Sequence, residues 1–457
     1  MALHALPDEL LIWVLRQLES PIDLSNVALC SRRLHNLVLP ILYLSFKDDG
    51  ALLKTPRFLA TTVRRPEIAR YVKKLSINGH NFRFFPPGTF DKNWDRIEAV
   101  LKPLCRKEET LRDWYHDLHH SADAIIALAI LLFPNVSIFT LPYYSSLRDV
   151  KYTPLVLSQT SRSRSSDLST LSPLYQLRTL TFDKSYRGVL FVEYVQPFLS
   201  LGSLRSVSIS DVWMIERDPA SKGSIGRPTS HITHLSLHRS SINTQALLLL
   251  LNGCPNLTHL SYCHSNINEE GDGFYNPFNT FQIHKTLMCL KRSLHVLNLL
   301  NLDEEIDNSN TEIYYPIREQ GASLPLGSLA DFEQLHTLQT TSRIILGGDG
   351  MPFRREPENR LSTEERALRI TDGLPKELET LVLYRCTESI YSVMTKVFER
   401  KEKGALKKLK KVTLMFRNSV ALSLDGASCI EQGLKVGIVV KCGDVALDQR
   451  RLPTWSP

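Results

Sequence analysis

One apolar pattern, L-x-x-L-x-L with other apolar residues allowed, recurs along most of this chain. Alternating apolar residues over a short stretch are typical of a strand with one buried face. Leu-rich or amphipathic stretches between copies predict helices at 121–133, 244–251, 281–291 and 388–401. A single strand–helix unit leaves an apolar face that only its neighbours can cover, so the pattern predicts stacked units in an α/β solenoid. The central positions of the copies are Leu75, Phe139, Leu180, Val207, Leu235, Leu260, Leu297, Leu338, Leu381 and Val412.

The spacing of the copies indicates insertions into a shorter basic unit. From Leu180 through Val207 and Leu235 to Leu260, the central positions are 27, 28 and 25 residues apart, whereas Leu75 and Phe139 are 64 apart. A late apolar stretch at 436–440 is a candidate closing strand. Polar or Gly/Pro-containing stretches are expected to be loops, and they lie at 158–172, 216–230, 269–279 and 347–360.

The first 45 residues have a different apolar pattern, which predicts three short helices. Pro7, followed by Asp8 and Glu9, suits the start of the first helix. Ser20-Pro21 begins a second helix, and Ser31 caps a third, which Pro40 is expected to end. The combined apolar face is larger than so short a segment can bury on itself. We therefore expect this segment to need either a partner or a packed neighbour, the alternative being an ordinary amphipathic helical hairpin.

The order of residues in this segment resembles an F-box. The match runs from Leu6-Pro7-x-Glu9-Leu10-Leu11 through Val14-Leu15-x-x-Leu18 and Asp23-Leu24 to Ala28-Leu29-Cys30-Ser31-Arg32-Arg33-Leu34. Leu34 stands where many members of the family carry Trp. In that family the segment binds the Skp-type adaptor of a cullin–RING ubiquitin ligase, so the resemblance implies that partner and the ligase core. It assigns adaptor binding to Leu6, Pro7, Leu10, Leu11, Val14, Leu15, Leu18, Leu24, Leu29 and Leu34.

The repeats are similar, more loosely, to the leucine-rich repeats of fungal-type F-box proteins, a repeat class with a period of about 20–29 residues. This resemblance implies a substrate-recognition subunit of an SCF-type ligase, with the target held by the repeat domain. The alternatives are a non-degradative scaffold bound to the adaptor, a repeat protein that senses a small molecule, and a generic α/β protein with Leu-rich strands. The expected organisation is an F-box at 1–45, a connecting segment at 46–70, a leucine-rich-repeat-like solenoid with inserted loops at 71–445 and a tail at 446–457.

Composition and charge limit the other classes. A formal net charge of +7 over 457 residues is mild and does not require nucleic acid as a partner. The longest apolar run, 124–133, is too short for the roughly 20 residues of a membrane span, and no basic leader precedes the first apolar stretch. The eight cysteines are scattered without a C-x-x-C pair, which fits a reducing compartment. We expect an intracellular protein, cytoplasmic or nuclear, without a membrane partner.

Catalytic and metal-binding motifs do not stand out in the sequence. The run from Gly347 to Gly350 lacks the spacing of a nucleotide-binding loop. His116, His119 and His120 precede a predicted helix, where we expect a solvated helix start rather than a metal site. The expectation is a non-enzymatic chain without cofactor or metal.

Outward positions of the predicted strands would form a polar face. Alternate residues of a strand point the same way, so His234 is expected beside His259, and His238 beside Cys263. Residues four apart on a strand are separated by about 13 Å, so the two pairs cannot share one metal ion. Such a face suits hydrogen bonding to a protein segment, the alternative being an ordinary wet surface. The candidate target-binding residues are His234, Ser236, His238, His259, Ser261, Asn298, Gln339 and Tyr384.

Overall fold

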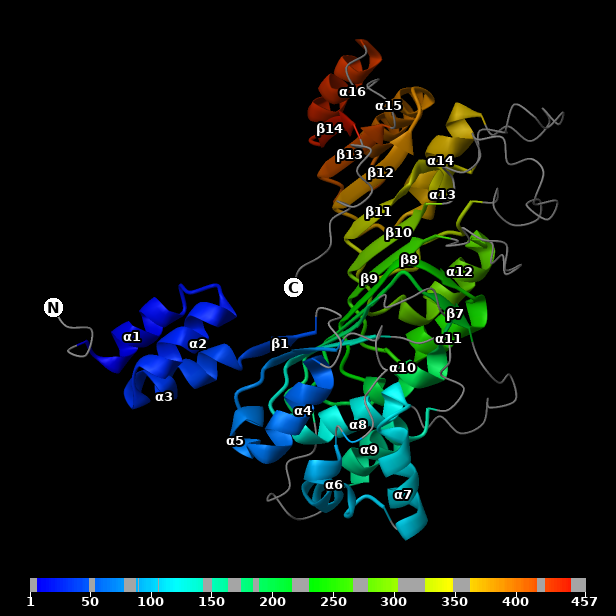
Figure 1. Cartoon of the computed structure of the whole chain (residues 1–457). Coiled ribbons are helices and arrows are strands. Elements are labelled where there is room, and N and C mark those ends of the chain that lie inside the picture. Colours follow the sequence, from blue (N-terminus) through cyan, green and yellow to red (C-terminus); the bar gives the residue numbers. More distant parts are fainter. Residues whose placement is uncertain are drawn as a thin grey trace, which may run out of the picture. The chain divides into compact units, whose positions relative to one another are not determined.

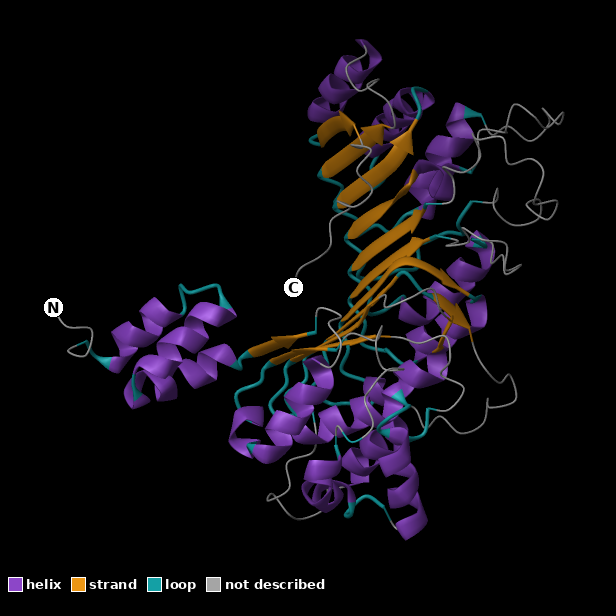
Figure 2. Ribbon diagram, in the orientation of Figure 1, coloured by secondary structure: helices purple, strands orange, loops and turns teal. Residues whose placement is uncertain are grey.

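The structure, a computed structural model, has the predicted α/β class. Its fourteen described strands belong to a parallel sheet that does not close on itself (Figure 2). The chain divides into two compact units, Met1–Ile232 and Thr233–Pro457. No helix in the described part of the chain has the length and apolar composition needed to cross a membrane. The structure describes residues 6–48, 54–77, 88, 90–105, 107–142, 150–162, 174–183, 189–215, 230–265, 278–302, 325–347, 362–416 and 424–444, with the backbone alone at 142, 159–162 and 444.

The first unit begins with three helices, α1 (Asp8–Leu15), α2 (Pro21–Cys30) and α3 (Arg32–Leu42) (Figure 1). The predicted caps are confirmed, because the Ser20 hydroxyl accepts a hydrogen bond from the Asp23 N–H and the Ser31 hydroxyl accepts one from Leu34. Their common core is built around Leu15, Leu24 and Val38.

The expected end of the third helix at Pro40 is wrong, since α3 continues to Leu42. A proline in the final turn removes only one main-chain hydrogen bond. The Tyr43 N–H still donates to the Leu39 carbonyl, which closes the turn.

The remainder of the first unit follows the repeat pattern. Strands β1 (Ser45–Lys47), β2 (Lys74–Ser76), β3 (Ile138–Pro142), β4 (Thr179–Asp183) and β6 (Ser206–Ser210) are neighbours in that order, and β5 (Val189–Phe191) pairs with β7 (Trp213–Ile215). The predicted central residues meet across the strands: Leu75 pairs with Phe139, Phe139 with Leu180, and Leu180 with Val207. The helices are α4 (Lys54–Arg64), α5 (Pro66–Ala69), η3 (Asp91–Asn93), α6 (Trp94–Leu101), α7 (Glu108–Asp117), α8 (Ala122–Leu132), α9 (Tyr152–Arg162) and α10 (Val192–Leu199).

The segment 46–70, which we expected to be a connection, begins within strand β1 of this sheet and contains α4 and α5. Phe46 of β1 pairs with Leu75 of β2. The Phe46 ring stacks on Phe58 of α4 at 3.9 Å between centroids, and Phe58 stacks on Phe133 at 5.3 Å. The segment therefore adds one more strand–helix unit. Sequence reasoning missed it because β1 has only three residues and no copy of the repeat pattern.

Helix α8 explains the longest apolar run of the sequence. Its residues Ala124 to Ile130 are all fully buried, so the run is a core helix. Asp123 in its first turn is buried too, and its carboxylate accepts hydrogen bonds from the main-chain N–H groups of Lys151, Tyr152 and Thr153. These donors start α9, which runs to Arg162 and so occupies the first part of the loop expected at 158–172.

The second unit repeats the same arrangement with better regularity. Its strands are neighbours in chain order, and their central residues, from Leu235 through Leu260, Leu297, Leu338, Leu381 and Val412 to Val440, are in register. The helices of this unit lie along one face of its sheet (Figure 2). The strands are β8 (His234–Ile242), β9 (His259–His264), β10 (Val296–Asn301), β11 (Thr337–Thr341), β12 (Thr380–Cys386), β13 (Lys411–Phe416) and β14 (Val439–Asp444).

The second unit contains the three helices that the sequence predicted for it. The helices are α11 (Thr244–Asn252), α12 (Thr280–Leu287) with η6 (Met288–Leu290), α13 (Ser342–Leu346), α14 (Thr363–Gly373), α15 (Ser389–Glu402) and α16 (Leu424–Lys435). Those expected at 244–251, 281–291 and 388–401 are thus confirmed, as is the one at 121–133 in the first unit. Most of the loops expected at 158–172, 216–230, 269–279 and 347–360 lies outside the described residues, namely 163–172, 216–229, 269–277 and 348–360, and so does the tail at 446–457.

The closing strand begins three residues later than expected. Gly437 has φ +75°, and the N–H groups of Ile438 and Gly437 donate to the carbonyls of Gly433 and Leu434. This hydrogen-bond pattern is a Schellman motif that ends α16. Because the motif uses residues up to Ile438, β14 begins at Val439.

We predict that Asp123→Ala lowers the free energy of unfolding by about 3 kcal/mol, because three main-chain donors lose a buried acceptor. Urea unfolding followed by tryptophan fluorescence measures the change. Asp113→Ala is the control: its exposed ion pair with Lys151 is expected to contribute less than about 1 kcal/mol. Equal effects of the two substitutions would contradict the capping role.

Candidate docking surface and polar sheet face

The helices α1 and α2 each present an apolar stripe to solvent. Leu10, Trp13 and Val14 of α1 are 51%, 64% and 44% exposed. Their spacing of three and four residues places them on one side of the helix. On α2, Ile22 and Leu29 are 72% and 84% exposed and lie two turns apart. Pro7, just before α1, is exposed as well.

Other members of the expected adaptor-binding set lie inside the three helices. Leu11, Leu15, Leu24 and Leu34 are at most 6% exposed, so in this structure they are core residues and not surface residues. They form the core that holds the exposed stripes in place. Leu6 and Leu18 are half-buried, and Leu18 packs against that core.

Arg33, from the Ser-Arg-Arg run, fixes the start of α1 against α3. Its Nε and Nη2 atoms donate to Asp8 Oδ1 at 2.8 and 2.6 Å, and Nη2 also donates to the Leu6 carbonyl at 2.7 Å. A guanidinium that binds a side chain and the main chain together restricts the direction in which α1 leaves the N-terminal segment. It thereby sets the position of Leu10, which lies in the same first turn of α1 as Asp8.

Trp13 and Ile22 were missed by the sequence reasoning, although both are more exposed than Leu10. The helical spacing of Trp13 from Leu10 was the available signal. Trp is also the residue type most enriched among energetically dominant contacts at interfaces.

The second unit brings most of the expected sheet-face residues together. His234 pairs with His259, and Ser236, Ser261, Asn298 and Gln339 form one row across four strands. The adjacent inward rows, such as Leu235, Leu260 and Leu297, are buried. The row of His234 ends at Val439 on β14, and the row of Ser236 ends at Lys441; both end residues are exposed.

His238 does not lie beside Cys263, contrary to the expectation. The register shifts after Leu237, so that Ser240 pairs with His264, and Arg239 has φ +47°. Three steps along β8, from Leu237 to Ser240, thus face two steps along β9, so β8 contains one extra residue. An extra residue of this kind is a β-bulge, which changes the direction of the side chains that follow it. Cys263 is instead opposite Leu300 and is only 2% exposed.

Asn298 is buried, which removes it from the surface that a target could contact. Its Nδ2 donates to Ser261 Oγ at 3.2 Å. Tyr384 of β12 pairs with Thr341 of β11, and its hydroxyl donates to Oε1 of Gln339, two residues earlier on β11, at 3.3 Å. Burial raises the pKa of the Tyr384 hydroxyl above its ordinary value. Ser236, Ser261, Gln339 and Tyr384 remain half-exposed, and so do His234, His238 and His259.

Four imidazoles lie at the amino ends of β8 to β11. The His234 and His259 rings stack at 4.2 Å between centroids, and the His295 and His336 rings lie 5.5 Å apart. Thr258 Oγ1 lies 3.0 Å from the Thr233 carbonyl oxygen and shares a hydrogen bond with His259 Nδ1 at 2.8 Å. Burial, and then the neighbouring histidines, lower the pKa of His259 to about 4; burial also lowers that of His234.

The other histidine cluster is not simply solvated. His119 is 12% exposed, and its Nε2 lies 3.8 Å from Asp91 Oδ1. Burial lowers the pKa of His119 more than the Asp91 carboxylate raises it. His116, by contrast, is exposed in α7. Among the residues that the structure describes, no group of three or more His, Cys, Asp or Glu side chains is placed to hold a metal ion.

Comparison with models of known protein families and with curated proteins gave no match to this chain.

We predict that acid destabilises the second unit by protonating the imidazole row, that is, His234, His259, His295 and His336. The unfolded chain binds a proton at His259 near pH 6.5, whereas the folded chain does so only near pH 4. The free energy of unfolding that neutral His259 contributes is therefore fully present above about pH 6.5 and is lost as the pH is lowered toward 4. Urea midpoints from circular dichroism across this range measure the loss. His259→Gln should flatten the profile, and the exposed His231→Gln should not; equal slopes in all three proteins would contradict the prediction.

Proposed function

We propose that this chain is the substrate-recognition subunit of an SCF-type ubiquitin ligase. Its three N-terminal helices act as an F-box that binds a Skp-type adaptor, and its strand–helix units act as a degenerate leucine-rich-repeat solenoid that binds a target protein. The proposal rests on the F-box-like residue order together with the exposed apolar stripes of α1 and α2.

The stripes carry the proposal because the helices do not need them for their own core. Leu15, Leu24 and Val38 already fill that core. Large apolar side chains left in water cost roughly 25 cal/mol per Å² of apolar area, and a docked partner recovers part of that cost. Leu10, Trp13, Val14, Ile22 and Leu29 are thus the residues we assign to the adaptor.

The half-exposed polar rows of the second unit are the proposed target face. Hydroxyl, amide and imidazole groups on neighbouring strands offer hydrogen-bond donors and acceptors at the regular spacing of about 4.8 Å between strands. His234, His259, Ser236 and Ser261 form paired positions there. Gln339 and Tyr384 extend the face by two further strands.

Such a subunit needs no catalytic residue of its own. A ligase that holds a target near the activated ubiquitin gains rate from proximity, because two reactants fixed in one assembly no longer have to meet by diffusion. Strand–helix units suit this role, since side chains on neighbouring strands are held at a fixed spacing and can keep a bound target in one position.

We predict that Leu10→Ser combined with Trp13→Ala weakens binding to a purified Skp-type adaptor by roughly 30-fold or more, as expected for loss of a dominant interface contact. Calorimetric titration measures the affinity. Because both residues are exposed, the circular dichroism spectrum and melting temperature should stay near those of the wild type.

The matched control is Leu434→Ser, a 59% exposed leucine of α16 that should leave adaptor affinity unchanged. No binding by the wild type, or equal affinity of wild type and double variant, would contradict the assignment.

A cellular comparison of the same proteins separates a ligase from a scaffold. With the proteasome blocked, proteins captured by both wild type and double variant are candidate targets. A ligase subunit should yield ubiquitinated forms of them only with the wild type. Captured proteins that carry no ubiquitin with either form would favour a non-degradative scaffold.

A further inference from the structure

A small pocket of about 300 Å³ opens in the second unit, away from the polar rows of the sheet. Its walls come from the segment 325–328, from Ile345 of α13 and from the last turn of α14 with Leu374. Leu326, Ile345 and Leu374 are buried apolar side chains, so most of the wall is apolar. Arg369 of α14 supplies the charged group in this lining.

The surrounding main chain holds the pocket in shape. The Leu326 N–H donates to the Ile344 carbonyl at 2.6 Å, and the Leu329 N–H donates to the Gly373 carbonyl at 2.7 Å. Gly327 lies against the ring of His284, where an added Cβ would come within 2.7 Å of Nδ1. The 325–328 segment is therefore fixed to α12, α13 and α14 together.

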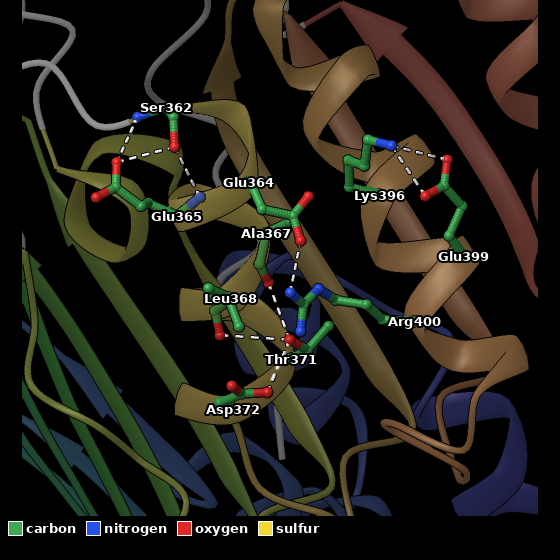
Figure 3. Close-up of polar contacts among 10 residues, drawn as sticks. All are labelled: Ser362, Glu364, Glu365, Ala367, Leu368, Thr371, Asp372, Lys396, Glu399 and Arg400. Atoms are coloured by element: carbon green, nitrogen blue, oxygen red, sulfur yellow. Dashed lines mark hydrogen bonds and ion pairs between the residues drawn. The ribbon is translucent and has the colours of Figure 1, made fainter.

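Arg369 borders the pocket, unlike the two glutamates at the start of α14. Glu365 accepts from the Ser362 N–H in a capping box, and Glu364 pairs with Arg400 of α15 at 2.5 Å (Figure 3). Arg369 is half-buried, and its Nη1 is buried without a hydrogen-bond partner in the described part of the chain. Glu365, one turn earlier, interacts with the Arg369 charge, but a buried guanidinium nitrogen without an acceptor still costs the fold free energy. An anion that reaches Nη1 is therefore favoured.

From this geometry we propose that the pocket binds a small monocarboxylate with an apolar body, whose carboxylate pairs with the Arg369 guanidinium. One guanidinium compensates one negative charge, which favours a carboxylate over a dianion. Leu326, Ile345 and Leu374 then cover the apolar body, and a volume near the lower end of ligand pockets limits it to a compact molecule. This site is independent of the proposed ligase role.

The test uses the full-length chain and hexanoate as the probe, with ligand-observed NMR titration as the readout. We expect saturable binding to the wild type and affinity at least about 10-fold weaker for Arg369→Gln, since a hydrogen-bonded charge is lost. Arg369→Lys should bind with intermediate affinity, because lysine keeps the positive charge but cannot donate two parallel N–H hydrogen bonds to the carboxylate. The exposed Arg343→Gln on α13 is the matched control and should bind like the wild type.

Hexanamide, which keeps the apolar body but carries no charge, should bind the wild type at least about 10-fold more weakly than hexanoate. This comparison needs no variant, so it stands even if Arg369→Gln fails to fold. Absence of saturable hexanoate binding, equal binding of the two probes, or equal binding by wild type and Arg369→Gln would each overturn the proposal.

Discussion

The matched apolar rows between parallel strands are the interaction on which the rest of this structure depends. Each repeat contributes one central side chain, and in the second unit these residues run in register from Leu235 to Val440. A one-residue slip would turn every such side chain to the opposite face of the sheet. The register therefore also determines which polar residues face away from the helices, and so where a target face can form.

The N-terminal helices obey a different constraint. Their core is filled by a few leucines and Val38, yet the sequence supplies more apolar side chains than that core accommodates. The surplus lies in two exposed stripes, whose positions are set by the caps at Ser20 and Ser31 and by the contacts of Arg33. Exposed Trp and Leu on a rigid surface are costly in water and favourable at an interface.

Periodic features could be predicted from the sequence, and features that depend on single residues could not. The repeat pattern placed the central residue of ten strands, because alternation of apolar residues reports directly on a buried strand face. It could not reveal the bulge at Arg239, which moves His238 away from Cys263, or the three-residue strand β1. Helical spacing likewise predicted that Leu10, Leu11 and Leu15 lie on an apolar helix, but two apolar stripes on one helix do not say which one faces inward.

Sites built from distant segments were equally beyond the sequence. The pocket beside Arg369 combines residues 325–328, 345, 369, 373 and 374, and no local motif connects them. The imidazole row is a similar case, because His295 and His336 join His234 and His259 only once the strands are aligned.

Docking through the exposed stripes is tested most directly by hydrogen–deuterium exchange of the full-length chain, alone and with a purified Skp-type adaptor. If α1 and α2 are the docking surface, amides between Asp8 and Cys30 should exchange more slowly when the adaptor is present, while those of β8 to β12 should not change. Unchanged exchange between Asp8 and Cys30, or protection confined to the sheet, would contradict the assignment.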